Sequence, residues 1–385
     1  MKEWKTYKVG DICSSISETY KSKSKSVVLI NTSDVLEGRC LNHEFVPNKD
    51  LKGQFKKVFK FGDILYSEIR PANKRFAYID FDATDYIAST KLMVLRNNDK
   101  ITKRFLYHYL KSDSTIAELQ ALAESRSGTF PQITFSELSQ LEISIPDIET
   151  QLAISNFIDT LESKIELNRQ INDNLEQQAS NLFQDWLNNC ENSIMLRELT
   201  DNVLDYTPNT HEYVYLLNSS DVTEGQFTVL PLTPNINLKG QFKKRFKKGD
   251  ILYSEIRPRN RHYAYCYFDA DKYIASTRLI VLRAKPEMLT SSILLYQYLM
   301  LNNVFEEFTL KTESRSGTFP QGNYEDLSSI KVPYGASQEK IAKALESIYK
   351  QLWINLEENE RLEALRDSLL PKLMSGELKI NEIDC

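Results

Sequence analysis

Residues 151–186 read QLAISNFIDTLESKIELNRQINDNLEQQASNLFQDW. Apolar side chains recur there at two positions of a seven-residue repeat, as in a coiled-coil helix. The first position holds Ile154, Leu161, Asn168, Leu175 and Leu182, and the second holds Ile158, Ile165, Asn172, Ala179 and Trp186. This period predicts one long helix that pairs with another helix along the stripe.

The same pattern returns 187 residues later in the chain. There the first position holds Ile341, Ile348, Asn355, Leu362 and Leu369, and the second holds Leu345, Leu352, Asn359, Arg366 and Leu373. Two helices with matched stripes are natural partners for each other. We therefore expect them to form an intramolecular coiled coil.

Two asparagines interrupt each apolar stripe at the same place. A buried side-chain amide costs free energy unless another polar group faces it. One antiparallel register pairs Asn168 with Asn359 and Asn172 with Asn355. The same register pairs Leu161 with Arg366, Leu175 with Leu352 and Leu182 with Leu345. We expect the asparagines to fix this register; the alternative is that they lie on a solvated face of each helix.

The remainder of the chain is an internal duplication. Residues 51–96 and 238–283 are identical at 34 of 46 positions, and ESRSGTFPQ occurs unchanged at 124–132 and 313–321. A repeat of this length indicates a duplicated domain rather than a solenoid unit. The expected domain order is a first domain at 1–147, a helix at 148–192, a second domain at 193–335, a helix at 336–378 and a tail at 379–385.

Each domain is expected to be mixed α/β. Alternating or continuous apolar runs predict strands at VVLIN, GDILYSEI, FAYIDF, LMVLR and LEISIP, with one helix near 103–123 and a loop at SRSGTFPQ. The fold class is therefore two duplicated α/β domains separated by an antiparallel coiled coil, with approximate two-fold symmetry. About 36 helical residues at about 1.5 Å each give a separator of roughly 50 Å, a little over one turn of DNA.

Composition and charge bound the function only loosely. The formal net charge is −5, and the five cysteines are widely scattered. No basic segment followed by an apolar core opens the sequence, and no run approaches the roughly 18 apolar residues that cross a bilayer. We expect a cytoplasmic chain with free thiols and no membrane contact.

Positive charge is concentrated in two equivalent stretches, KDLKGQFKKVFK at 49–60 and KGQFKKRFKK at 239–248. Such stretches can neutralise DNA phosphates. The phosphate-contact candidates are Lys52, Gln54, Lys56 and Lys57 in the first copy and Lys239, Gln241, Lys243, Lys244 and Arg245 in the second. The alternative is a solvated, lysine-rich surface turn.

Arginine and asparagine gather in SEIRPANKR at 67–75 and SEIRPRNRH at 254–262. These side chains can bind guanine and adenine edges through two hydrogen bonds. The base-reading candidates are Arg70, Asn73, Lys74 and Arg75, together with Arg257, Arg259, Asn260, Arg261 and His262; Arg126 and Arg315 in the SRSGT loop are further candidates. The alternatives are a salt-bridged hairpin for the first set and a tight turn for the loop.

Differences between the two copies cluster at residues 72–75 and 259–262. Two nearly identical readers predict two similar, inverted half-sites that differ at one or two base pairs. Exchanging these four residues between the copies is expected to move one half-site toward the other.

Motifs for catalysis are absent from the sequence. The glycines form neither a dinucleotide-binding fingerprint nor a phosphate loop, and there is no Pro-Pro-Tyr tetrapeptide. Asp63, Glu68 and Arg70 loosely resemble a nuclease acid pair, but an ion pair between Glu68 and Arg70 is simpler. The four histidines show no ligand spacing, so no metal is expected.

Taken in order, the repeated motifs resemble a specificity subunit of a Type I restriction-modification system, over essentially the whole chain. The motifs are GDILYSEIRP, IASTKLMVLR or IASTRLIVLR, SRSGTFPQ, the closing IP or VP, and the helix openings ETQLAI and SQEKIA. The resemblance implies a non-catalytic subunit that reads a bipartite target in double-stranded DNA.

The same resemblance implies partners that supply the chemistry. These are two methyltransferase subunits using S-adenosylmethionine to modify adenine, and restriction subunits using ATP and magnesium; this chain itself is expected to hold no cofactor. One departure is that recognition domains of this family usually differ from each other, whereas these are near copies. The rival class is a duplicated scaffold that binds only proteins.

Overall fold

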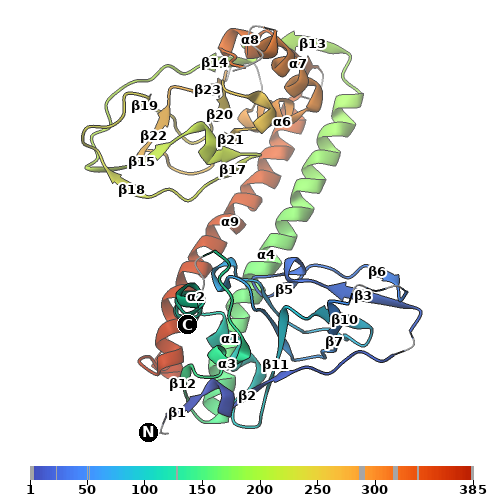
Figure 1. Cartoon of the computed structure of the whole chain (residues 1–385). Coiled ribbons are helices and arrows are strands. Elements are labelled where there is room, and N and C mark those ends of the chain that lie inside the picture. Colours follow the sequence, from blue (N-terminus) through green and yellow to red (C-terminus); the bar gives the residue numbers. More distant parts are fainter. Residues whose placement is uncertain are drawn as a thin grey trace. The chain divides into compact units, whose positions relative to one another are not determined.

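The computed structural model describes residues 4–382 except 23, 50, 52, 127–128, 286–290, 315–319 and 336–337. Two compact units are present, Met1–Glu166 with Glu360–Cys385, and Leu167–Asn359. Each unit contains one of the duplicated domains and a stretch of both long helices, α4 at Ile148–Asn188 and α9 at Gln338–Ser375 (Figure 1). None of the described helices has an apolar stretch of the length that spans a membrane.

The first domain is built on two four-stranded sheets, ordered β2-β11-β8-β9 and β6-β3-β10-β7. Their strands are β2 Cys13–Ile16, β3 Ser26–Ile30, β6 Phe45–Pro47, β7 Phe55–Lys57, β8 Ile64–Ser67, β9 Phe76–Tyr78, β10 Tyr86–Ser89 and β11 Leu92–Asn97. Strand β10 runs parallel to β3 and antiparallel to β7, so the second sheet is mixed. The strands predicted from VVLIN, GDILYSEI, FAYIDF and LMVLR are confirmed.

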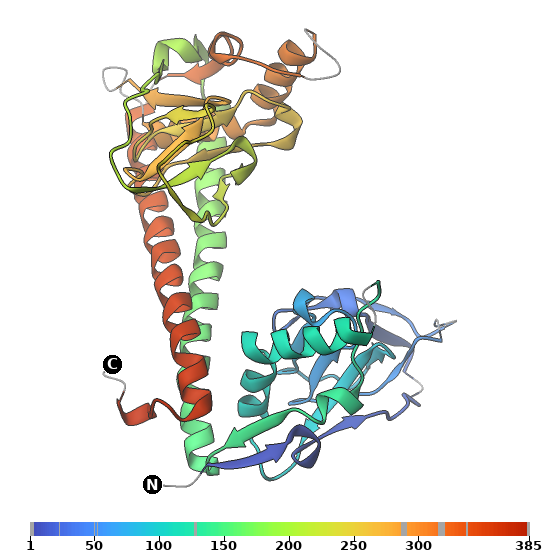
Figure 2. The same ribbon diagram turned by 60° about the vertical axis from the view of Figure 1, so that its left-hand side comes forward.

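Shorter elements complete this domain. Two-stranded pairs join β1 Lys5–Lys8 to β12 Glu142–Ile145 and β4 Val35–Leu36 to β5 Arg39–Cys40; the helices are η1 Val9–Asp11, η2 Thr32–Asp34, η3 Pro71–Asn73, α1 Lys103–Leu110, α2 Asp113–Arg126 and α3 Phe135–Leu138. Strand β12, predicted from LEISIP, leads directly into α4, and Figure 2 shows β1 and β12 beside the first turns of that helix.

The second domain repeats this topology strand for strand, with sheets ordered β14-β23-β20-β21 and β18-β15-β22-β19. Its strands are β13 Asn192–Met195, β14 Thr200–Asn202, β15 Tyr213–Leu217, β16 Val222–Thr223, β17 Gln226–Phe227, β18 Leu232–Pro234, β19 Phe242–Lys244, β20 Ile251–Ser254, β21 Tyr263–Tyr265, β22 Tyr273–Ser276, β23 Leu279–Ala284 and β24 Lys331–Tyr334. Its helices are α5 Leu196–Leu199, η4 Ser219–Asp221, η5 Pro258–Asn260, α6 Ser292–Met300, α7 Asn302–Glu313 and α8 Tyr324–Ser328, and η7 Ile380–Glu382 follows α9. The duplication inferred from sequence is thus a duplication of the fold.

Strand β8 shows how the layers of a domain are held together. Ile64 and Tyr66 belong to the core that faces α1 and α2, whereas Leu65 between them belongs to the core that faces the other sheet. Successive side chains of a strand point to opposite faces, so a strand buried on both faces is apolar throughout. The unbroken run ILY and its counterpart in β20 therefore mark the central layer of each domain.

The prediction of a single helix near 103–123 is wrong in one respect, because the chain forms two helices there, α1 and α2. The break falls at Ser112, which is buried. Its Oγ accepts a hydrogen bond from the backbone N–H of Thr115 (3.3 Å) and so caps the first turn of α2. An unrecognised N-cap serine inside an otherwise helical run explains the difference.

Within the second unit, α4 and α9 pair in the antiparallel register that the sequence predicts. Asn168 Nδ2 donates to Asn359 Oδ1 (2.9 Å), and Asn355 Nδ2 donates to Asn172 Oδ1 (2.8 Å). All four amides are buried, with exposed fractions of 1–7%. The alternative of a solvated asparagine face is therefore wrong.

The predicted stripe is incorrect at Leu182, which is 36% exposed, while its neighbour Phe183 is 1% exposed and lies in one core with Leu345. An α-helix drifts by about 20° per heptad against a strict seven-residue repeat. Four heptads from Ile154 give roughly 80°, close to the 100° or so between successive residues. Phe183 therefore replaces Leu182 on the inner face.

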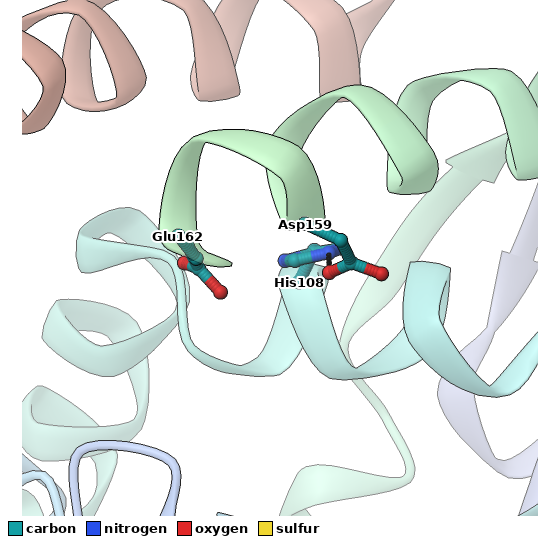
Figure 3. Close-up of side chains that lie close together, drawn as sticks. All are labelled: His108, Asp159 and Glu162. Carbon is teal, nitrogen blue, oxygen red and sulfur yellow. Dashed lines mark hydrogen bonds and ion pairs between the residues drawn. The ribbon is translucent and has the colours of Figure 1, made fainter. Parts of the chain in front are cut away.

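In the first unit, the domain packs on α4 through a polar cluster as well as through its core (Figure 3). His108 of α1 is completely buried, and its Nε2 lies 2.8 Å from Asp159 Oδ1 on α4. Arg104 forms an ion pair with the same carboxylate, and Lys111 forms one with Glu162. His108 Nδ1 is buried without a hydrogen-bond partner among the described residues.

Of these charges, the second unit keeps only the acidic one of Asp159, as the exposed Glu346. Gln297 takes the place of His108 in α6, and its Nε2 donates to the hydroxyl of Tyr349 (2.5 Å), which takes the place of Glu162. The two copies therefore attach a similar domain to the coil by different chemistry, through ion pairs in one unit and through a neutral hydrogen bond between Gln297 and Tyr349 in the other.

The amide pairs lead to a test of the register. Replacing Asn168 and Asn172 by Leu removes the two amide–amide hydrogen bonds of Asn355 and Asn359, at a cost of about 1–3 kcal/mol for each buried group that loses its bond. Replacing all four asparagines by Leu is expected to restore stability and to permit other registers. In a cysteine-free background, L175C with L352C reports the native register and L175C with L345C a one-heptad slip. The register hypothesis is wrong if the four-leucine variant forms only the native crosslink.

The buried histidine leads to a pH prediction. Burial lowers the pKa of His108 below its ordinary value. Below about pH 6.5 the unfolded chain therefore binds a proton that the folded chain does not, and stability falls as pH falls, by up to roughly 1.4 kcal/mol per pH unit. Asp159, with a pKa near 2, stays ionised in this range.

H108Q, which installs the residue of the second copy, is expected to reduce the loss of unfolding free energy between pH 7.0 and 5.5. Urea unfolding at both pH values measures it, and H211Q at an exposed histidine is the matched control. Equal pH dependence in H108Q and the unchanged chain would show that His108 does not titrate on unfolding.

Candidate nucleic-acid interface

The repeated sequence motifs converge in space within each domain. In the first domain, the backbone N–H of Arg70 donates to Pro131 O (3.1 Å), and that of Ile133 donates to Glu68 O (2.8 Å). The equivalent bonds in the second domain join Arg257 to Pro320 (3.0 Å) and Gly322 to Glu255 (2.8 Å). The SEIRP loop and the TFPQ loop are thus tied together by main chain, twice over.

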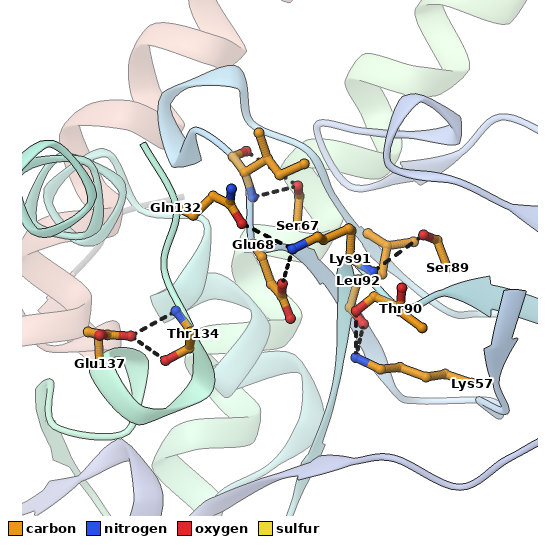
Figure 4. Close-up of polar contacts among 11 residues, drawn as sticks. Lys57, Ser67, Glu68, Ser89, Thr90, Lys91, Leu92, Gln132, Thr134 and Glu137 are labelled. Carbon is orange, nitrogen blue, oxygen red and sulfur yellow. Dashed lines mark hydrogen bonds and ion pairs between the residues drawn. The ribbon is translucent and has the colours of Figure 1, made fainter. Parts of the chain in front are cut away.

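The IASTK motif and the basic turn lie against the same pair of loops in the first domain (Figure 4). The backbone N–H of Glu68 donates to Lys91 O (3.0 Å), and Lys91 Nζ lies 3.1 Å from Gln132 Oε1 and 3.5 Å from Glu68 Oε2. The backbone N–H of Thr90 donates to Gln54 O (2.7 Å), which adds the basic turn. We call these segments the four-loop surface: residues 53–57, 67–71, 89–92 and 129–132, and in the second domain 240–244, 254–258, 276–279 and 320–321.

Identity between the copies is concentrated in these segments. The first-domain segments have 18 positions, and 17 of these are identical in the sequence of the second copy, whereas residues 102–123 and 291–312, which contain the helices, share only 5 of 22. A recent duplication alone would leave similar identity everywhere. The contrast indicates that both domains need the same chemistry on this surface.

An arginine occupies a strained backbone position on the surface in both domains. Arg70 has φ 44° and Arg257 has φ 45°, in the left-handed region that L-residues avoid. Both side chains are exposed. The TFPQ loop holds this geometry through the bonds above, and strain retained twice at an exposed arginine is typical of a functional position.

The structure corrects the basic-turn prediction for two lysines. Lys57 Nζ donates to Thr90 O (3.0 Å) and Leu92 O (2.8 Å), and Lys244, only 4% exposed, donates to Leu279 O (2.6 Å). Burial lowers the pKa of both amines. These lysines support the turn beneath the surface, so the geometry does not favour the phosphate contacts predicted for Lys57 and Lys244.

The other basic-turn candidates differ in position. Exposed side chains are those of Gln54, Lys56, Lys239, Gln241 and Lys243. Gln241 Nε2 donates to Asn218 Oδ1 (3.0 Å), and Arg245 is half-buried and donates to Asp271 O (2.9 Å). Lys52 lies outside the described residues.

Several base-reading candidates are engaged within their own domain. Lys74 pairs with Asp113 (3.0 Å) and Arg259 with Glu313 (2.7 Å) on the neighbouring helix, while Arg261 donates to Asn302 Oδ1 (3.1 Å). Arg75 donates to Ser33 O (3.0 Å), and His262 Nδ1 lies 2.9 Å from Val222 O.

The remaining candidates are at or near the loops. Asn73 and Asn260 are exposed in η3 and η5, next to the left-handed arginines. Arg126 forms an ion pair with Glu137, and Arg315 lies outside the described residues. Arg70 Nη2 itself donates to Thr129 O (3.4 Å) within the surface. Exposure and the left-handed backbone found in both copies favour Arg70 and Arg257, with the adjacent Asn73 and Asn260, over the rest of the predicted set.

Sequence reasoning missed three pairs on the four-loop surface, Thr90 with Thr277, Lys91 with Arg278, and Gln132 with Gln321. These residues lie in the repeated motifs IASTK and TFPQ. Comparing the segments that are identical in the two copies with those that differ would have identified them.

The acidic groups suspected of catalysis have structural roles. Asp63 accepts two hydrogen bonds from Arg96 (both 2.7 Å), as Asp250 does from Arg283 (2.7 and 2.8 Å). Glu68 faces Lys91 rather than Arg70, so the predicted ion-pair partner is wrong.

One described group brings three potential metal ligands together, namely His108, Asp159 and Glu162. Arg104 and Lys111 already neutralise its two carboxylates, so the residues present do not suit a cation. The four described cysteines, Cys13, Cys40, Cys190 and Cys266, are free thiols, as predicted.

Comparison with known proteins agrees with this architecture. Residues 1–177 and 218–364 match the family model described as Type I restriction modification DNA specificity domain. Over 188 residues the chain is 50% identical to the specificity subunit of the Type I restriction enzyme HindI from Haemophilus influenzae, a match covering 48% of this chain and 41% of that protein.

Longer but weaker matches also occur. The MjaIX specificity subunit of Methanocaldococcus jannaschii is 20% identical over 372 residues, covering 88% of this chain and 82% of that protein. The crystal structure of a Type I restriction-modification system S subunit from M. genitalium is 18% identical, covers 97% of this chain and 96% of that chain, and has a TM-score of 0.60. That likeness concerns the fold. By its family match, the chain belongs to the Type I restriction-modification DNA specificity family, whose members are the non-catalytic specificity subunits of these systems.

Proposed function

We propose that this chain reads a bipartite target in double-stranded DNA, one half-site with each domain. The observation that carries the proposal is the four-loop surface, which presents the same exposed polar and basic side chains in both domains. Direct reading needs hydrogen-bond donors and acceptors held at base edges by a rigid frame, and the main-chain bonds between the loops supply such a frame.

Different side chains of the surface suit different parts of the duplex. Lys56, Lys239 and Lys243 are exposed cations that suit phosphate oxygens. Arg70 and Arg257 have the planar fork that fits guanine O6 and N7, and Asn73 and Asn260 have the amide that fits adenine N6 and N7. Gln54 and Gln241 offer the same amide pattern on the adjoining turn.

The near identity of the two surfaces supports two similar half-sites. The antiparallel register of the long helices supports an inverted arrangement of these halves, because each domain is followed by one helix of the pair. The target is then nearly palindromic around a spacer of fixed length.

The chemistry comes from partners in this proposal. Two methyltransferase subunits would bind S-adenosylmethionine and modify adenine, and restriction subunits would use ATP and magnesium; the chain itself positions them. Charged residues of α4, such as Lys164 and Asp173, are exposed, and their outer face is the surface proposed for docking.

Removing the strained arginines tests direct reading. R70A and R257A are each expected to weaken binding of the target duplex by about 5- to 100-fold, the value of one good base contact. Filter binding of the purified complex at fixed salt measures this effect, and K5A, which removes one exposed charge from β1, is the control. Equal losses of DNA affinity in R70A and K5A would show that Arg70 contributes only general electrostatic attraction.

Sequencing of methylated sites tests partner and geometry together. DNA exposed to the chain, its methyltransferase subunits and S-adenosylmethionine is expected to carry methyl groups at two similar inverted halves around a fixed gap. Unrelated halves would contradict the symmetry of the target. No methylation, with no DNA retained at low salt, would favour a scaffold that binds only proteins.

A further inference from the structure

The twelve positions that differ between residues 51–96 and 238–283 fall into separate structural groups. Three lie in the cores, namely Phe76 with Tyr263, Ile79 with Cys266 and Met93 with Ile280. Others adapt each domain to its own surroundings: Lys74 and Arg261 face different residues of α2 and α7, and Tyr267 stacks near Trp353 of the coil. Such differences have local structural reasons.

One difference lies inside the four-loop surface itself. Lys91 in the first domain is replaced by Arg278 in the second, and this is the single non-identical position among the 18. Both side chains are exposed. The backbone around them is the same, since Glu68 N–H donates to Lys91 O at 3.0 Å and Glu255 N–H donates to Arg278 O at 2.9 Å.

The two cations have different partners on this common frame. Lys91 Nζ is bonded to Gln132 Oε1 and faces Glu68, so its charge is largely used within the domain (Figure 4). In the second domain, Gln321 bonds instead to the carboxylate of Glu255. The charge of Arg278 also acts on this carboxylate, but within the described part of the chain its guanidinium donates no hydrogen bond.

Lysine and arginine differ in how well they bind a guanine edge. A lysine ammonium is a compact point charge, whereas an arginine guanidinium presents a planar fork of donors that matches guanine O6 and N7. An exposed arginine whose donors are unused, surrounded by residues that both domains share, is placed to add one base contact that the first domain lacks.

We propose that Lys91 and Arg278 set the difference between the two half-sites, with Arg278 specifying a guanine at a position where Lys91 imposes no such preference. The inference rests on the proposed function, because it requires that the four-loop surface faces DNA. It assigns the discrepancy between half-sites to this position and not to the residues that differ within 72–75 and 259–262, whose polar side chains are engaged within their domains.

Selection from randomised duplexes tests the assignment, with the full chain and its co-expressed methyltransferase subunits as the binding species. The unchanged chain is expected to select two similar halves, with one guanine preferred in only one of them. K91R is expected to add the guanine preference to the other half, and R278K to remove it, each by about 5- to 100-fold. The double variant K91R/R278K should move the guanine preference to the opposite half-site.

Exchange of residues 72–75 for 259–262 is the matched comparison, and it is expected to leave base preference unchanged. If the unchanged chain selects a bipartite target but K91R and R278K both select that same target, the assignment to Lys91 and Arg278 is overturned while DNA reading stands. If the unchanged chain selects no target at all, the proposed function itself fails. A change in base preference caused by the 72–75 exchange alone would assign the difference between half-sites to those residues instead.

Discussion

Two pairs of buried amides fix how the long helices meet, and the packing of both domains depends on that register. Leu373 of α9 lies in the core of the first domain with Ile154, and Leu345 lies in the core of the second. A slip of one heptad would bring Arg366 toward the place of Leu373 and bury a charge in an apolar core. Amide pairing at the middle of the coil and apolar packing toward its ends therefore specify the same register.

Much of the fold follows from the sequence because periodicity and duplication are independent signals that agree. The seven-residue pattern predicts the helices, its asparagines predict the pairing, and the repeat predicts that one topology occurs twice. Local details escape such reasoning. The break at Ser112 depends on one side chain capping a helix, and Phe183 replaces Leu182 because helical drift accumulates over four heptads.

The candidate site was harder to predict than the fold, since a surface is assembled from segments distant in sequence. Lys56 and Lys57 are neighbours in a basic run, yet one is exposed and the other bonds to main chain, because successive residues of β7 point to opposite faces. Charge density in the sequence could not distinguish them. Residues 72–75 were singled out because they differ, but the helices they pack against differ as well.

Main-chain bonds between the loops explain how one side chain can change without cost to the frame. Arg70 to Pro131 and Arg257 to Pro320 differ by 0.1 Å, as do the two bonds that hold Lys91 and Arg278. These main-chain bonds do not involve the side chain at this position, so they form with either cation there. The exposed side chain can then diverge between duplicated domains while the frame is preserved, because the main-chain groups that hold the loops together and the groups at the end of that side chain are different atoms.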